Sequence, residues 1–144
     1  MTFAGSGAVT FVDTNILVYA HDASESLKQP VAAAVVEELW RTGTGVVSAQ
    51  VLQEFYVVAT RRFDPPMSRS EAREIVEAYG SWDPVTTDVL LILSASALEQ
   101  RHRLSFWDAL IVEAALRAGA TRIATEDLQA GRRYETVEII NPFI

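Results

Sequence analysis

The stretch Val9-Thr10-Phe11-Val12-Asp13-Thr14-Asn15 predicts a strand that passes directly into a helix. Its first four residues are mostly β-branched or aromatic, which predicts a short buried strand. The polar residues that follow are suited to capping a helix, through Thr14 or Asn15. A buried strand that passes directly into a helix is typical of a parallel sheet, where ligands bind beyond the carboxyl ends of the strands. Side chains at such strand ends are therefore the first candidates for a functional site.

The rest of the chain alternates helical and extended patterns. We expect helices over residues 16–21, 31–41, 49–62, 68–80, 87–103 and 105–118, strands over 46–47, 122–125 and 136–140, a short extended piece at 83–85 and a loop over 126–133. Short apolar strands between helices indicate an α/β protein with three α/β/α layers around a short parallel sheet. Because no linker or repeat interrupts the pattern, we expect a single domain over residues 1–144.

Composition limits the possible functions. The 144 residues include 12 Lys and Arg against 19 Asp and Glu, which gives a net charge of −7. This acidic balance argues against nucleic-acid binding through bulk attraction to phosphates. The absence of cysteine excludes a disulfide scaffold and thiolate metal ligands, and it agrees with a reducing cytoplasm. No apolar run approaches the roughly 18 residues of a membrane span, and residues 1–9 do not resemble a signal peptide.

Four acidic side chains stand at positions where the local pattern favours other residues. Asp13 ends the first strand, and Asp127 follows the strand over 122–125. At about 100° per residue, Glu54 lies beside the apolar stripe of its helix. By the same measure, Asp108 lies in the middle of the apolar face of its helix. Burying an unpaired charge is costly, so Asp108 needs a partner.

Each of these acids also has a plain structural explanation, which the local sequence leaves open. Asp13 is a good helix cap, and Glu54 can lie at the rim of the core with its carboxylate in water. Ser105 and Asp108 match a capping box. The acid at 127 can be a solvated loop residue. The four positions become informative only when they are taken together.

Together, the four acids would lie near one edge of the sheet. Two carboxylates about 4 Å apart repel by about 4 kcal/mol at an effective dielectric of 20, so the cluster would need protons, arginines or a metal ion. We expect at least one acid to have a pKa raised by its like-charged neighbours. Oxygen ligands without Cys or His favour Mg²⁺ or Mn²⁺, and either ion beside a cleft commonly serves phosphoester chemistry.

Four short motifs resemble, in the same order, those of PIN-domain nucleases. They are Phe11-Val12-Asp13-Thr14-Asn15, the SAQVLQEF stretch over 48–55, Ser105-Phe106-Trp107-Asp108-Ala109-Leu110-Ile111, and Thr125-Glu126-Asp127. The resemblance extends over nearly the whole chain. The compact length is similar to that of VapC-type toxins of bacterial toxin–antitoxin pairs.

The resemblance implies a PIN-like, Mg²⁺- or Mn²⁺-dependent endoribonuclease. Its catalytic and metal-binding acids would be Asp13, Glu54, Asp108 and Asp127. Asn15 and Thr125 would be polar supports that orient a carboxylate or a water. The adjacent Glu126 leaves the fourth position open, although the spacing from Thr125 favours Asp127. The implied partners are an RNA substrate, a cognate antitoxin protein and a second copy of the chain in a homodimer, without a membrane.

Other functions remain open at this point. One is a non-catalytic, dimeric, PIN-like binding module, and another is a metal-dependent phosphatase of another α/β class. The sequence lacks a GxGxxG turn and a P-loop, and Asp13-Thr14-Asn15 lacks the second acid of an Asp-x-Asp phosphatase. Several early apolar residues could form a dimer face or simply the core: Leu17, Val18, Val35, Val36, Leu39 and Trp40.

Overall fold

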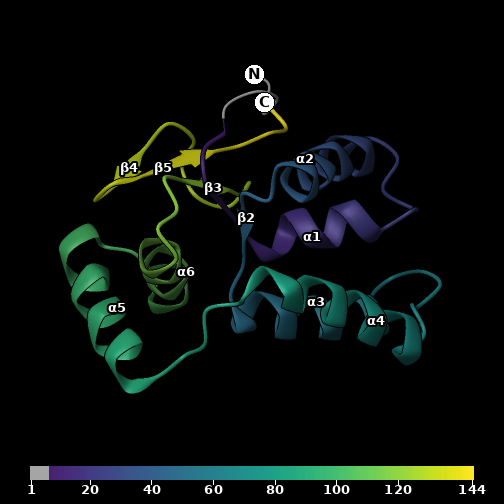
Figure 1. Cartoon of the computed structure of the whole chain (residues 1–144), viewed down its shortest axis with the longest axis horizontal. Coiled ribbons are helices and arrows are strands. Elements are labelled where there is room, and N and C mark those ends of the chain that lie inside the picture. The colour runs from purple at the N-terminus through teal and green to yellow at the C-terminus, as the bar shows by residue number, and fades with distance from the viewer. Residues whose placement is uncertain (1–6) are drawn as a thin grey trace.

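The computed structural model describes residues 7–144 and contains one five-stranded sheet, in the order β2-β1-β3-β5-β4 (Figure 1). The strands are β1 (Thr10–Val12), β2 (Gly45–Val46), β3 (Arg122–Ala124), β4 (Arg133–Tyr134) and β5 (Val137–Ile140). Pairing is parallel between β1 and β2, β1 and β3, and β3 and β5. Only β4 runs antiparallel, beside β5.

Helices cover the sheet on both sides, which confirms the expected three-layer α/β/α architecture. The α-helices are α1 (Thr14–His21), α2 (Lys28–Thr42), α3 (Ala49–Arg61), α4 (Arg69–Tyr79), α5 (Val89–His102) and α6 (Phe106–Arg117), with a 3-10 turn at Gly80–Trp82. Figure 1 shows α5 and α6 side by side to one side of the central strands, and α1 to α4 to the other. No helix within residues 7–144 is long and apolar enough to span a membrane.

Short polar side chains begin most of these helices. Ser48 Oγ accepts a hydrogen bond from Val51 N at 3.3 Å, and Ser68 Oγ accepts one from Glu71 N at 3.1 Å. Each bond satisfies an N–H group that has no partner within its own helix. Because a cap lies within three residues of the group it satisfies, the sequence alone could predict these helix starts.

The segment after β3 differs from the sequence expectation. Residues 126–133, predicted as a loop, end in β4, which pairs with β5 through Arg133–Glu138 and Tyr134–Val137. The turn between the two strands places Glu135 at a positive φ of 55°. A strand of two residues has no periodicity, so only its pairing with β5 defines it. The extended piece expected at 83–85 is reduced to one bridge between Val85 and Ser48.

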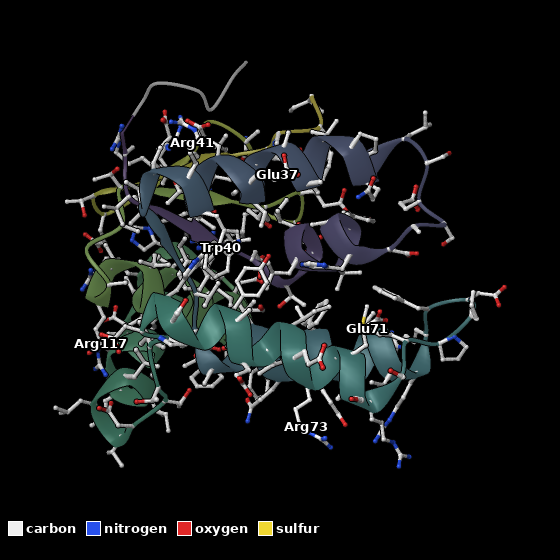
Figure 2. All side chains as sticks on the ribbon, turned by 45° about the vertical axis from the view of Figure 1, so that its right-hand side comes forward. Glu37, Trp40, Arg41, Glu71, Arg73 and Arg117 are labelled. Carbon is white, nitrogen blue, oxygen red and sulfur yellow. The ribbon has the colours of Figure 1, made fainter. Side chains whose placement is uncertain are left out.

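The early apolar helices form core rather than a free face. The side chains of Leu17, Val35, Val36 and Leu39 are buried in one hydrophobic cluster with the strands. Trp40 is 40% exposed, but its ring reaches from α2 toward α4 (Figure 2). The centroid of the Trp40 ring lies 4.9 Å from that of Trp82.

Candidate active site

The site is built at the carboxyl edge of the sheet, where β1 and β3 end side by side. Their register pairs Val12 with Ala124, so Asp13 and Thr125 each follow directly after the last paired residues. The ladder continues for one more step, because Asp13 N donates to Ala124 O at 3.1 Å. The sheet therefore brings together two residues that are 112 positions apart in the sequence.

Asp13 caps α1 and is also buried at the strand end. Its Oδ1 accepts a hydrogen bond from Thr14 N at 2.7 Å, and its Oδ2 accepts one from Thr125 Oγ1 at 2.9 Å. The side chain is only 7% exposed. The expectation that Thr14 or Asn15 caps this helix is wrong, because α1 begins at Thr14 and includes both residues. The carboxylate of Asp13 can accept further bonds while it caps the helix, since each oxygen keeps a second lone pair.

Thr125 and Asn15 link Asp13 to Asp127. The fully buried hydroxyl of Thr125, which donates to Asp13, accepts hydrogen bonds from Asn15 Nδ2 at 3.1 Å and from Asp127 N at 3.1 Å. Asn15 Nδ2 also donates to Asp127 Oδ2 at 3.0 Å. The two residues expected as polar supports thus lie between two of the expected acids.

The electrostatics of Asp13 are those of a buried acid without a cation. Its pKa is raised from 3.8 to about 6, mainly because burial removes water from the charged form. Hydrogen bonds from Thr14 and Thr125 lower the pKa, and the negative charges of Asp127 and Glu54 raise it further. The expectation of a raised pKa is correct in direction. However, burial contributes more to it than repulsion between like charges.

The other two expected acids lie on helices. Glu54 is exposed on α3, and its charge raises the pKa of Asp13. Asp108 is half-buried in the first turn of α6, where its backbone N donates to Ser105 Oγ at 3.1 Å. Among residues 7–144, no hydrogen bond joins the Asp108 side chain to the network around Thr125. The described residues therefore link Asp13 to Asp127 through Thr125 and Asn15. Glu54 acts on Asp13 through its charge, and Asp108 is not part of this hydrogen-bond network.

Glu126 faces a different environment from Asp127. Its Oε2 lies 2.7 Å from Lys28 Nζ, and its Oε1 accepts a hydrogen bond from the hydroxyl of Tyr19. In contrast, none of the four expected acids forms an ion pair within the described part of the chain. No local pattern in the sequence predicts Lys28 and Tyr19 as neighbours of the site. The only available signal was that Lys28 is the single lysine of the chain.

The donor chemistry of this edge fits a hard divalent cation, although the ligand set is not closed. Within residues 7–144, no three Asp, Glu or His side chains are grouped closely enough to hold a metal ion together. The available donors are carboxylate and hydroxyl oxygens, which Mg²⁺ and Mn²⁺ prefer. Glu54 and Asp127 are exposed, so the core encloses neither carboxylate.

The comparison with protein families agrees with this geometry. Residues 10–135 match the model of the PIN domain, and the chain belongs to the PIN-domain family. Proteins of this family are generally metal-dependent nucleases. No curated protein shows a significant match to the chain.

Proposed function

We propose that this PIN-domain protein is an endoribonuclease that uses Mg²⁺ or Mn²⁺ to hydrolyse RNA phosphodiester bonds. The observation that carries the proposal is the buried carboxylate of Asp13 at the sheet edge, linked through Thr125 to Asp127. Neither acid is neutralised by an arginine or a lysine among residues 7–144. A cation would remove both the desolvation cost of Asp13 and the repulsion from its neighbours.

Each residue of the site has a distinct role in this proposal. Asp13, Glu54, Asp108 and Asp127 hold the cation. Thr125 keeps one lone pair of Asp13 occupied and so fixes the orientation of that carboxylate, while Asn15 fixes Asp127. When bound, the cation supplies charge neutralisation at the phosphoryl oxygens and activation of a water molecule.

The decisive test is RNA cleavage by the purified chain with Mg²⁺, with Mn²⁺ and with EDTA, on structured and unstructured RNA. Asp13→Asn and Asp108→Asn should each reduce cleavage by more than the roughly 100-fold typical of changes outside the ligand set, with unchanged circular dichroism. Asp88→Asn is the matched control, because Asp88 caps α5 and bonds Arg117, outside the site. Cleavage by wild type that persists in EDTA would refute the proposal.

The alternative functions give different results in the same assay. A phosphatase of another α/β class would hydrolyse a small phosphomonoester faster than RNA. A non-catalytic binding module would cleave neither substrate and would show no Mg²⁺ or Mn²⁺ dependence in its thermal stability. Faster cleavage of DNA than of RNA would support a nuclease but would contradict RNA as its substrate.

We further propose that the chain is the toxin of a type II, VapC-like toxin–antitoxin pair, acting on RNA in the cytoplasm as a homodimer. The compact PIN domain supports this, as does the acidic site, which would accept an arginine from an antitoxin. Exposed apolar side chains on α5, such as Leu90 and Leu93, suit a second copy of the chain.

Growth should stop when the chain is expressed alone and recover when the neighbouring gene is expressed with it. Equal growth at equal protein level would contradict the toxin role, and a monomer in sedimentation would contradict the dimer.

A further inference from the structure

Glu126 is held to α1 at two points. Its backbone N donates to Asn15 Oδ1 at 3.2 Å, and its carboxylate accepts a hydrogen bond from the hydroxyl of Tyr19. Asn15 and Tyr19 are four residues apart on α1, so they lie on the same face of the helix, one turn apart. This face of α1 therefore hydrogen-bonds both the main chain and the side chain of Glu126, the residue that precedes Asp127.

Lys28 completes the arrangement from the start of α2. Its Nζ lies 2.7 Å from Glu126 Oε2 and 3.4 Å from the Tyr19 hydroxyl. The same ammonium lies 4.8 Å from the centroid of the Tyr19 ring and 5.4 Å from that of Phe143. The two rings meet edge to face, with centroids 5.4 Å apart. The lysine is thus held between a carboxylate and two aromatic rings, a setting in which cation–π attraction adds to the ion pair.

This network joins three segments that are distant in sequence. Tyr19 belongs to α1, Lys28 to α2 and Phe143 to the segment after β5, and all three surround the loop that carries Glu126. Burial alone would raise the pKa of Glu126. Hydrogen bonds from Lys28 and Tyr19 outweigh burial and hold the pKa below its usual value. Both carboxylate oxygens of Glu126 are thus paired within this network, one with Tyr19 and one with Lys28.

We propose that Glu126, Tyr19 and Lys28 form a strut that positions Asp127 for binding a divalent cation, and that Glu126 itself is not a ligand. This inference rests on the proposed function. Asp127 is exposed. Outside the strut, its backbone N donates to Thr125 Oγ1 and its carboxylate accepts a hydrogen bond from Asn15, and the strut adds a third hold on the residue directly before it. A ligand that is already in position loses less conformational entropy when the cation binds, which raises its affinity.

Lys28→Met distinguishes the strut from simple electrostatics, because the two explanations predict opposite changes in Mn²⁺ affinity. Removing a positive charge close to a cation site strengthens cation binding if only the field matters. Loss of the strut instead weakens Mn²⁺ binding by about tenfold, the scale of changes outside a ligand set. Lys28→Arg keeps the charge and the hydrogen bonds and should remain within about twofold of wild type.

Arg41→Met is the matched control on the same helix. Arg41 lies on α2 (Figure 2), near the opposite end from Lys28 and about 20 Å away along the axis. It pairs with Glu38. The substitution removes the same charge and also breaks an ion pair. It should leave Mn²⁺ affinity unchanged.

The measurement is a titration of chelator-treated full-length protein with Mn²⁺, in which the free ion is read by electron paramagnetic resonance. The single lysine allows a second arm, because an amine-acetylating reagent can modify only Lys28 and the terminal amine. Acetylated wild type should match Lys28→Met, and acetylated Lys28→Arg controls for the terminus. In an Asp127→Asn background, Lys28→Met should cause no further loss of affinity.

The outcomes separate the strut from the proposed function. If wild type binds Mn²⁺ and Lys28→Met binds it equally well or more tightly, the strut is refuted and the nuclease proposal stands. An undiminished tenfold loss in the Asp127→Asn background would also refute it, since the effect would not act through Asp127. If wild type binds no Mn²⁺, the proposed function fails and the strut's role toward a cation fails with it. Hydrogen exchange then reports separately whether the amides of residues 126 and 127 lose protection in Lys28→Met but not in Arg41→Met.

Discussion

Replacing Asp13 by asparagine should change how folding stability depends on pH. The pKa of Asp13 is about 6 in the folded chain, against 3.8 for a free aspartate. Each unit of difference corresponds to about 1.36 kcal/mol, so the roughly two-unit shift amounts to about 3 kcal/mol. Because the folded state holds this proton more tightly than the unfolded state, the stability it provides is fully present below pH 3.8 and is lost as the pH rises through about 6.

Asparagine has a similar shape but no charge to desolvate. In EDTA, the free energy of unfolding of Asp13→Asn, minus that of wild type, should therefore rise by about 2.4 kcal/mol between pH 4 and pH 7, because at pH 4 the unfolded aspartate is already partly ionised. For a domain of this size the corresponding shift in Tm is several degrees. Urea unfolding of both proteins across this pH range measures the difference.

Asp88→Asn supplies a control with the opposite slope. Asp88 also caps a helix, but its pKa is lowered by the backbone N–H of Leu91 and by Arg117. Its stabilising effect is present above the ordinary pKa and is lost as the pH falls through the lowered one. Asp88→Asn should thus cost stability near neutral pH and become harmless in acid.

Mn²⁺ should stabilise wild type much more than Asp13→Asn. At 100 times its dissociation constant it should add about 2.7 kcal/mol to the free energy of unfolding, and it should add little to Asp13→Asn. A stability difference between variant and wild type that stays constant from pH 4 to pH 8 would refute the argument from burial. A wild type whose stability ignores Mn²⁺ would refute the cation site.

Two further substitutions separate local structure from the site. Ser105→Ala should destabilise the chain by about 1 kcal/mol with or without Mn²⁺, whereas Asp108→Asn, which keeps the backbone N–H bonded to Ser105, should chiefly remove the Mn²⁺ response; thermal melts in EDTA and Mn²⁺ distinguish the two. Gly45→Ala should cost about 1–3 kcal/mol, because a Cβ there would lie 2.5 Å from Trp82 Cη2, and urea unfolding followed by tryptophan fluorescence measures it.

Features that depend on contacts between near neighbours could be predicted from the sequence. The caps at Ser48, Ser68 and Ser105 all involve groups within three residues of one another, and the strand before Asp13 is recognisable from the composition of four consecutive residues. Apolar periodicity located the six helices to within a few residues, because each helix must bury its own apolar stripe against the core. From these elements the α/β class and the sheet edge followed, and with them the positions of the expected acids.

Tertiary structure alone decided how those positions are used. Glu126 and Asp127 are adjacent acids in the sequence, yet Glu126 pairs with Lys28 and Asp127 bonds Asn15, 112 residues away. The strand β4 likewise exists only through its pairing with β5. The physical reason is that the register of parallel strands, and the helix that packs over each strand end, fix side-chain directions through contacts between distant segments. The residues around positions 126 and 127 do not encode which of the two carboxylates pairs with Lys28 and which bonds Asn15, because both partners come from other segments of the chain.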